Sequence, residues 1–266
     1  MVTTSFDVFA QCVMAIRSGE LIKSVSAKDK EFHFQNWFQA RLEEMGASFD
    51  EPGRNTYPDF RMVNNPEGFE IKGLAWPGRE RDYDCNSQVP SGMHNGRTIY
   101  YVFGRYPKSS AGENEYPVID LVICHGDFLN ADHEYKHKNK SFRGFGSYGD
   151  ILVRDRKMYV APTPFALTEG TTGNMTLILP DNIPRDKRFA SVGQLTRTEA
   201  DRLIIGYSFD LESNEIQEKT TPNPNAKVEH HFVAYRLNQQ PGQMVKMVAK
   251  PNLNEINENL DDDEEL

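Results

Sequence analysis

The stretch from Tyr57 to Gly73, YPDFRMVNNPEGFEIKG, constrains the fold of this chain more than any other. Its middle, Asn64 to Gly68, is a cluster of residues that favour turns. Two short hydrophobic runs, Phe60 to Val63 and Phe69 to Leu74, flank this turn and predict a pair of strands. The stretch therefore predicts a β-hairpin, in which successive side chains point to opposite faces.

This hairpin is expected to bring two acids and a lysine together. Asp59 precedes the first strand, and the hairpin folds Glu70 back beside it. Glu70 and Lys72 lie two residues apart, so both point to one face while Ile71 points into a core. Two carboxylates and an ammonium group in one place favour a hard divalent cation and an activated water molecule. The alternative is a surface hairpin with an ordinary ion pair between Glu70 and Lys72.

Pro58-Asp59 followed by Glu70-Ile71-Lys72 resembles the PD-(D/E)XK signature of the restriction-endonuclease-like nucleases. The resemblance implies an α/β (α+β) fold with a restriction-endonuclease-like mixed central β-sheet flanked by helices. It also implies that Asp59 and Glu70 hold Mg²⁺, with the carbonyl of Ile71 as a further ligand. Lys72 then assists the attacking water, so the implied catalytic residues are Asp59, Glu70 and Lys72.

The function that this resemblance implies is that of a type II restriction endonuclease. Such an enzyme hydrolyses double-stranded DNA at a short specific sequence and depends on Mg²⁺. The symmetry of duplex DNA favours a homodimer with one active site for each strand. Two alternatives remain. One is a PD-(D/E)XK repair or junction nuclease that recognises the shape of DNA, and the other is a non-catalytic DNA-binding protein.

The distribution of charge is compatible with a DNA partner, although the formal net charge is -9. Residues 255–266 hold seven of the 39 acids and no lysine or arginine, which leaves 32 acids against 30 basic residues. A nearly neutral body can still present a basic groove. We therefore expect one nuclease domain over residues 1–254 and a disordered acidic tail over residues 255–266.

Cysteine usage and hydropathy indicate a cytoplasmic protein. Cys12, Cys85 and Cys124 lie far apart and suggest neither a disulfide framework nor a structural zinc site. No apolar run approaches the length of a membrane span. The N-terminus contains Asp7 and no basic region, which is unlike a signal peptide. The sequence thus predicts no membrane partner.

A helix is expected before the hairpin, with Ser26 as its N-cap and Gly46 at its end. Its buried stripe is expected to consist of residues at helical spacing: Phe34, Phe38, Leu42 and Met45. Related nucleases often bring a Glu or Gln from this upstream helix near the metal, and Glu31 or Gln35 is the candidate here. The alternative is a solvated polar face. Further along, Thr196 as N-cap with Glu199 three residues later predicts another helix.

Two segments are expected to contact DNA. The first is a loop after the hairpin with small polar side chains that suit phosphates and adenine edges: Asn86, Ser87, Gln88 and Ser91. The second is a loop over residues 133–149, where cations alternate with aromatic rings. The cations expected to contact DNA are Lys136, Lys138, Lys140 and Arg143. The alternative for the first is an ordinary capped loop, and for the second a solvated loop.

The second segment also contains His133-Glu134-Tyr135-Lys136-His137, which matches the zinc-protease motif H-E-x-x-H. That motif requires a helix and a third ligand downstream. Here charged residues surround it, glycines follow, and after the motif no acid appears until Asp150. We favour the basic loop over the zinc motif.

Overall fold

A computed structural model describes residues 4–23, 30–50, 56–78, 80–86, 88–109, 114–137, 140–143, 146–153, 159–167 and 175–238. Its helices are α1 (Ser5–Ser18), α2 (Lys30–Glu44), α3 (Gly126–Leu129) and α4 (Pro164–Leu167). The strands of its main sheet are β2 (Phe49–Asp50), β3 (Phe60–Met62), β4 (Glu67–Trp76), β6 (Met93–His94), β7 (Arg97–Pro107), β9 (Asp120–His125), β14 (Thr176–Pro180), β15 (Phe189–Thr198) and β18 (Glu229–Leu237).

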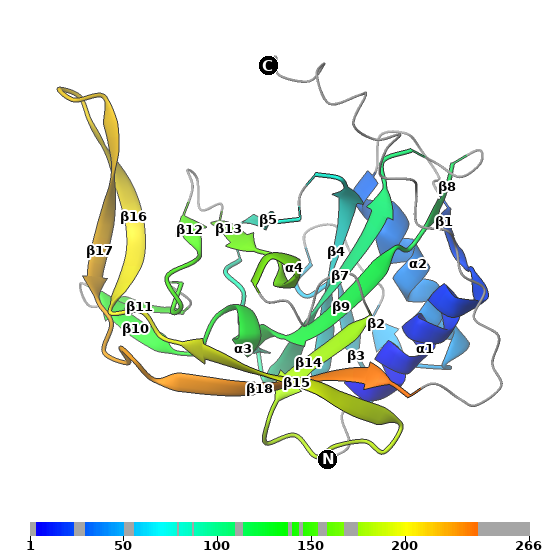
Figure 1. The fold of residues 1–266 in the computed structure, drawn as a ribbon. Helices are drawn as coiled ribbons and strands as arrows, with labels where there is room; N and C mark the ends of the chain where they lie inside the picture. Colours follow the sequence, from blue (N-terminus) through cyan, green and yellow to red (C-terminus); the bar gives the residue numbers. More distant parts are fainter. Residues whose placement is uncertain are drawn as a thin grey trace.

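The remaining strands form smaller sheets. They are β1 (Leu21–Lys23) with β8 (Glu115–Pro117), β10 (Glu134–His137) with β11 (Lys140–Arg143), and β16 (Arg202–Asp210) with β17 (Glu215–Pro222). A three-stranded sheet joins β12 (Leu152–Val153), β13 (Tyr159–Pro162) and β5 (Asp82–Asn86). The β16–β17 hairpin projects from the body of the molecule, at the left of Figure 1.

Across the described residues, the main sheet has nine strands in the order β15-β18-β14-β9-β7-β4-β3-β2, with β6 beside β7. It is a mixed sheet, because β4 and β7 are parallel and so are β9 and β14, whereas its other neighbours are antiparallel. The fold is therefore mixed α+β with a large mixed sheet. This confirms the mixed α+β class that was predicted, and both predicted strands of the hairpin are present as β3 and β4.

Each face of the main sheet has its own hydrophobic core. Phe69 and Ile71 of β4 belong to the core that α1 and α2 cover, on the right in Figure 1. Leu74 of β4 belongs to the opposite core, which contains side chains from β5, α3 and α4. The alternation along β4 means that Glu70 and Lys72 share the face of Leu74, away from the two long helices.

The helix predicted before the hairpin is present as α2. Phe34, Phe38 and Leu42 are its fully buried positions, as the spacing predicted. Its predicted N-cap, Ser26, lies outside the described residues. The ring of Phe34 packs where β4 and β7 each carry a glycine, Gly73 and Gly104, so this part of the sheet can accept the helix closely.

Gly104→Ala is expected to lower the free energy of unfolding by about 1–3 kcal/mol, the usual cost of overpacking a core. An added Cβ would lie 2.1 Å from Cζ of Phe34. Urea denaturation measures the change. Gly193→Ala is the matched control, because its Cβ would meet only Cβ of Ala234 at 4.0 Å. Equal stability of the two variants would contradict the packing of α2 described above.

The helix predicted from Thr196 is wrong. Thr196 lies in β15 and pairs with His231 of β18, while Leu203 and Ile204 belong to β16. A Ser/Thr-x-x-Glu pattern is only a local preference, and strand pairing overrides it here. The segment from Arg202 to Asp210 is also rich in β-branched and aromatic residues, which fit a strand.

Three further expectations concern the whole chain. Residues 239–266, which include the predicted acidic tail, lie outside the described residues. Cys12, Cys85 and Cys124 all lie in the described part, where each is buried and none forms a disulfide. No helix in the described ranges is long and apolar enough to cross a membrane.

Candidate active site

The β3–β4 hairpin positions Asp59 against β4. Phe60 pairs with Phe69 and Arg61 with Gly68, and the ladder ends there. Asp59 follows in the next position, where its Oδ2 accepts a hydrogen bond of 2.7 Å from the N–H of Ile71. The carboxylate thus accepts the hydrogen bond that a backbone carbonyl of a longer β3 would otherwise accept.

The carbonyl of Ile71 also faces this side. The N–H and C=O of one strand residue point to the same neighbour, and the N–H of Ile71 points to Asp59. The carbonyl therefore lies on the side where β3 has ended, rather than on the side of β7. A carboxylate and a backbone carbonyl are consequently directed to the same edge of β4.

Glu70 and Lys72 form an ion pair next to Asp59. The Nζ of Lys72 lies 2.9 Å from Oε1 of Glu70, and the side chains are 9% and 12% exposed. The other oxygen of Glu70, Oε2, is buried and has no hydrogen-bond partner among the described residues. The two acids and the lysine predicted from the sequence are therefore brought together.

The surroundings of this group are aromatic and nearly closed. Tyr57 and Tyr101 share a hydrogen bond of 2.9 Å between their hydroxyls. Burial raises the pKa of Tyr57, and the nearby negative charge of Glu70 adds to this shift. Burial also raises the pKa of the Cys85 thiol to about 12, against the opposing effect of the Lys72 ammonium. Tyr57 and Cys85 are thus neutral at pH 7.

The upstream helix does not lie on this face. Because α2 packs on the side of Phe69 and Ile71, Gln35 belongs to the opposite side of the sheet from Glu70. The side chain of Glu31 lies outside the described residues. The expected role of Gln35 near the metal is therefore not supported. Helical spacing identified the buried stripe of α2 correctly, but it does not reveal which face of a sheet that stripe covers.

The predicted polar DNA-contact loop has a more internal position than expected. Ser91 is 5% exposed, and its hydroxyl donates to the carbonyl of Met93 at 2.7 Å and lies 3.1 Å from Asp132 Oδ1. Gln88 is partly buried and donates to the carbonyl of Val89 at 3.3 Å. Ser87 and the side chain of Asn86 lie outside the described residues. Ser91 is thus buried and hydrogen bonded within the protein.

The predicted basic loop contains a β-hairpin. Lys136 lies in β10, and Lys140 and Arg143 lie in β11, whereas Lys138 falls outside the described residues. The side chains of this hairpin are also outside the described part. A helical H-E-x-x-H site is wrong, because residues 134–137 form strand β10.

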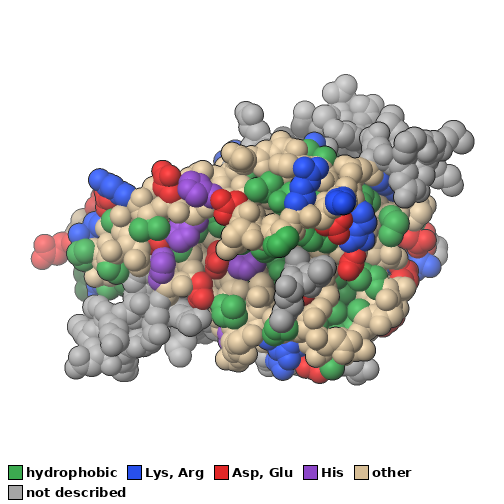
Figure 2. Space-filling view, turned by 90° about the horizontal axis from the view of Figure 1, so that it is seen from below, with side chains coloured by type: hydrophobic (Ala, Val, Ile, Leu, Met, Phe, Trp, Pro, Cys, Tyr) green, Lys and Arg blue, Asp and Glu red, His purple; other side chains and the backbone are tan. Residues whose placement is uncertain are grey.

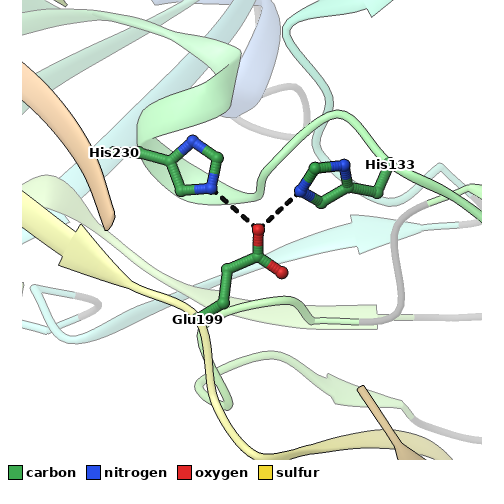
Figure 3. A group of neighbouring side chains, drawn as sticks. All are labelled: His133, Glu199 and His230. Atoms are coloured by element: carbon green, nitrogen blue, oxygen red, sulfur yellow. Dashed lines mark hydrogen bonds and ion pairs between the residues drawn. The ribbon is translucent and has the colours of Figure 1, made fainter. Parts of the chain in front are cut away.

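A second polar group lies away from the β3–β4 hairpin. His133 and His230 each direct Nε2 to Oε1 of Glu199, at 2.5 and 2.8 Å (Figure 3). Figure 2 shows histidine side chains gathered with acidic ones on the face seen from below. From the sequence, Glu199 is expected to cap a helix, and only the pairing of β15 with β18 brings it near His230.

Comparison with known proteins assigns no family to this chain. No protein-family model matches the sequence, and no curated protein matches it significantly. The geometry of the group formed by Asp59, Glu70 and Lys72 is therefore the basis on which function is proposed.

Proposed function

We propose that this protein is a Mg²⁺-dependent endonuclease of the type II restriction class, which cleaves double-stranded DNA at a short specific sequence. The observation that carries the proposal is that Asp59, which precedes β3, is held against β4 between Glu70 and Lys72, which form an ion pair. These residue types, in this order along a hairpin, have the acid, acid and lysine pattern of the PD-(D/E)XK signature.

The chemistry of the group fits a hard cation. Such ions take oxygen ligands, and here Asp59, Glu70 and the Ile71 carbonyl would hold Mg²⁺. A buried carboxylate oxygen without a partner costs free energy, and Oε2 of Glu70 is such an atom among the described residues. When bound, Mg²⁺ supplies positive charge beside the phosphate and lowers the pKa of a bound water.

The remaining roles fall to the protein's own groups. Lys72, held by Glu70 at 2.9 Å, orients the attacking water and stabilises negative charge that develops on the phosphate. The N–H of Ile71 fixes the orientation of Asp59. Attack by the water oxygen on phosphorus breaks the P–O3′ bond, so a 5′-phosphate and a 3′-hydroxyl result. Burial strengthens these charge interactions relative to water.

Digestion of a phage genome with the purified protein tests the proposal. Mg²⁺ should produce discrete fragments, and sequencing of their ends should give one short shared site. Cleavage should stop when EDTA removes the metal. Branched DNA cut in preference to duplex would favour the repair or junction nuclease instead. Binding without cleavage at any Mg²⁺ concentration would leave only the non-catalytic DNA-binding protein.

The proposal includes a homodimer, because one active site is needed for each strand of the duplex. The projecting β16–β17 hairpin offers an apolar surface for the second copy. Phe209, Leu211 and Ile216 on this hairpin are 53%, 87% and 70% exposed. Light scattering that gives the mass of a monomer, with and without a short duplex, would contradict this part of the proposal.

Exchange of Lys136, Lys138 and Lys140 for glutamine is expected to weaken DNA binding and reduce its dependence on salt. Each phosphate contact contributes roughly one unit to the slope of log affinity against log salt, so the slope should fall by up to about three. Fluorescence anisotropy with a short duplex at several salt concentrations measures it. The control is a triple glutamine variant of exposed lysines elsewhere, Lys23, Lys108 and Lys187. Equal slopes in both triple variants would exclude the hairpin as a DNA contact.

A further inference from the structure

The group of His133, Glu199 and His230 joins three segments that are distant in the sequence. His133 follows α3, Glu199 lies between β15 and β16, and His230 lies at the start of β18. The possible ligand atoms of the three side chains all lie within 4.8 Å of one another. Both histidines direct the same ring nitrogen, Nε2, to a single carboxylate oxygen (Figure 3).

We infer that this group is a binding site for a transition-metal ion of the Zn²⁺ class, separate from the proposed Mg²⁺ site. Two imidazole nitrogens and one carboxylate oxygen are ligands that zinc accepts, whereas Mg²⁺ prefers oxygen alone. Ligand atoms about 2.1 Å from a tetrahedral ion are separated from one another by roughly 3.4 Å. The observed separations of 2.5 and 2.8 Å need to open by less than about 1 Å to reach this geometry.

The carboxylate is held in place before any ion binds. Glu199 is 2% exposed, and its second oxygen, Oε2, accepts a hydrogen bond of 3.1 Å from Asn223. Its backbone N–H donates to Val228 and its carbonyl accepts from Lys227, both at 2.9 Å. Partners of this kind orient metal ligands and raise affinity. Glu199 therefore presents Oε1 to the two histidines in a fixed orientation.

The histidines leave one side of the site open. The side chains of His133 and His230 are 28% and 25% exposed, in contrast to the fully buried side chain of Glu199. The ring of Tyr148 packs edge-on against His230, with 5.8 Å between the ring centres. Tyr148 is itself fixed by a hydrogen bond of 2.5 Å from its hydroxyl to the carbonyl of Asp127. Three protein ligands and an accessible fourth position, filled by water, are the arrangement that such a site would have.

An ion at this position would join separate parts of the fold. β10 begins directly after His133, β16 begins three residues after Glu199, and β17 leads into β18, where His230 lies. An ion bound here ties the bases of the β10–β11 and β16–β17 hairpins to the main sheet. His133 also begins the H-E-x-x-H pattern, but the second histidine of the site is His230 rather than His137. This inference does not depend on the nuclease proposal.

Zinc binding to the full chain tests the site. The purified protein, stripped with a chelator, is titrated with ZnCl₂ in excess MgCl₂, so that a hard-cation site is already filled. One zinc per chain is expected. His133→Asn and His230→Asn should each lower the zinc affinity at least about a hundredfold, and Asn223→Ala about tenfold. His231→Asn is the matched control, since it is the next residue of β18 and its side chain is 53% exposed.

Two further measurements keep the test decisive if a histidine variant does not fold. Glu199→Gln keeps the size of the side chain and should still lose most of the affinity. In the wild-type chain, Co²⁺ should give the visible absorption of a four-coordinate site. Addition of Zn²⁺ should displace the Co²⁺ and abolish this absorption.

Hydrogen exchange tests the structural role of the ion. Zinc should slow exchange at the N–H groups of Glu199 and Lys227, both of which are hydrogen bonded at the site. Exchange in β4 should not change. The inference would be overturned if the wild type does not bind stoichiometric zinc. It would also be overturned if the His133, Glu199 and His230 variants bind zinc with the affinity of the wild type. Zinc binding without protection of these two N–H groups would overturn its structural role.

Discussion

Glu70→Gln is expected to abolish Mg²⁺-dependent cleavage of duplex DNA while the protein stays folded. Glutamine keeps the size of the side chain but removes the negative charge that a hard cation requires. Oε2 of Glu70 is buried and has no hydrogen-bond partner among the described residues, so the wild-type position is built for a charge-bearing contact. Asp59→Asn should have the same effect, and its remaining oxygen can still accept the hydrogen bond from Ile71.

Single-turnover cleavage of a duplex that carries the recognition site measures both variants. We expect rates at least about a hundredfold below wild type, the scale for loss of one electrostatic contact in the transition state. Asp50→Asn is the control, because Asp50 is an exposed acid of the same sheet, on β2. If either active-site variant melts as the wild type does and cuts at the wild-type rate, Asp59 and Glu70 do not form the active site.

The candidate site was predictable because its information is local. The turn between β3 and β4, the alternation along β4 and the positions of Asp59, Glu70 and Lys72 all lie within one short stretch. A hairpin fixes its own register through its turn and its hydrophobic pattern. The geometry of the acid, acid and lysine group therefore follows from residues that are close in the chain.

The second polar group was not predictable in this way. His133 and Glu199 are separated by 66 positions, and they meet only because of strand pairing between distant segments. Glu199 also carries a misleading local signal, since the residues around it match a helix start. The informative feature is instead its burial, because a fully buried carboxylate requires partners. Burial of a polar residue depends on the tertiary fold.

The packing of α2 shows the same limit in the hydrophobic core. Spacing alone identified Phe34, Phe38 and Leu42 as buried. On the face of the sheet that they cover, Gly73 and Gly104 lie on neighbouring strands and leave room for Phe34. Helical periodicity predicts that a residue is buried without indicating its partners. The position of Gln35 relative to Glu70, on the opposite side of the sheet, could not be predicted for this reason.

Replacement of Lys72 separates the chemical step from DNA binding. Lys72 lies 2.9 Å from Glu70 on the face that the proposed active site occupies. Its role of orienting water and stabilising charge is exerted mainly in the transition state, so its loss lowers the rate more than the affinity. Lys72→Ala should bind Mg²⁺ and DNA but cleave at least about a hundredfold more slowly under single-turnover conditions. Lys72→Arg should not restore the rate, because a guanidinium retains its proton and has a different geometry.

Lys72→Ala is also expected to lower the stability of the protein, and this effect has to be separated from the loss of activity. Lys72 is 8% exposed, and its removal leaves Glu70 without its 2.9 Å charge partner. Breaking a buried ion pair costs about 3–5 kcal/mol. The double variant Glu70→Gln, Lys72→Met removes both charges and should regain much of this stability without regaining activity. Gly104→Ala is the second control, because it weakens the fold at the packing contact with Phe34 on the opposite face of the sheet and should cleave at the wild-type rate below its melting temperature. If Lys72→Ala cleaves as fast as Gly104→Ala under these conditions, Lys72 takes no part in the reaction, and the nuclease proposal loses its main support.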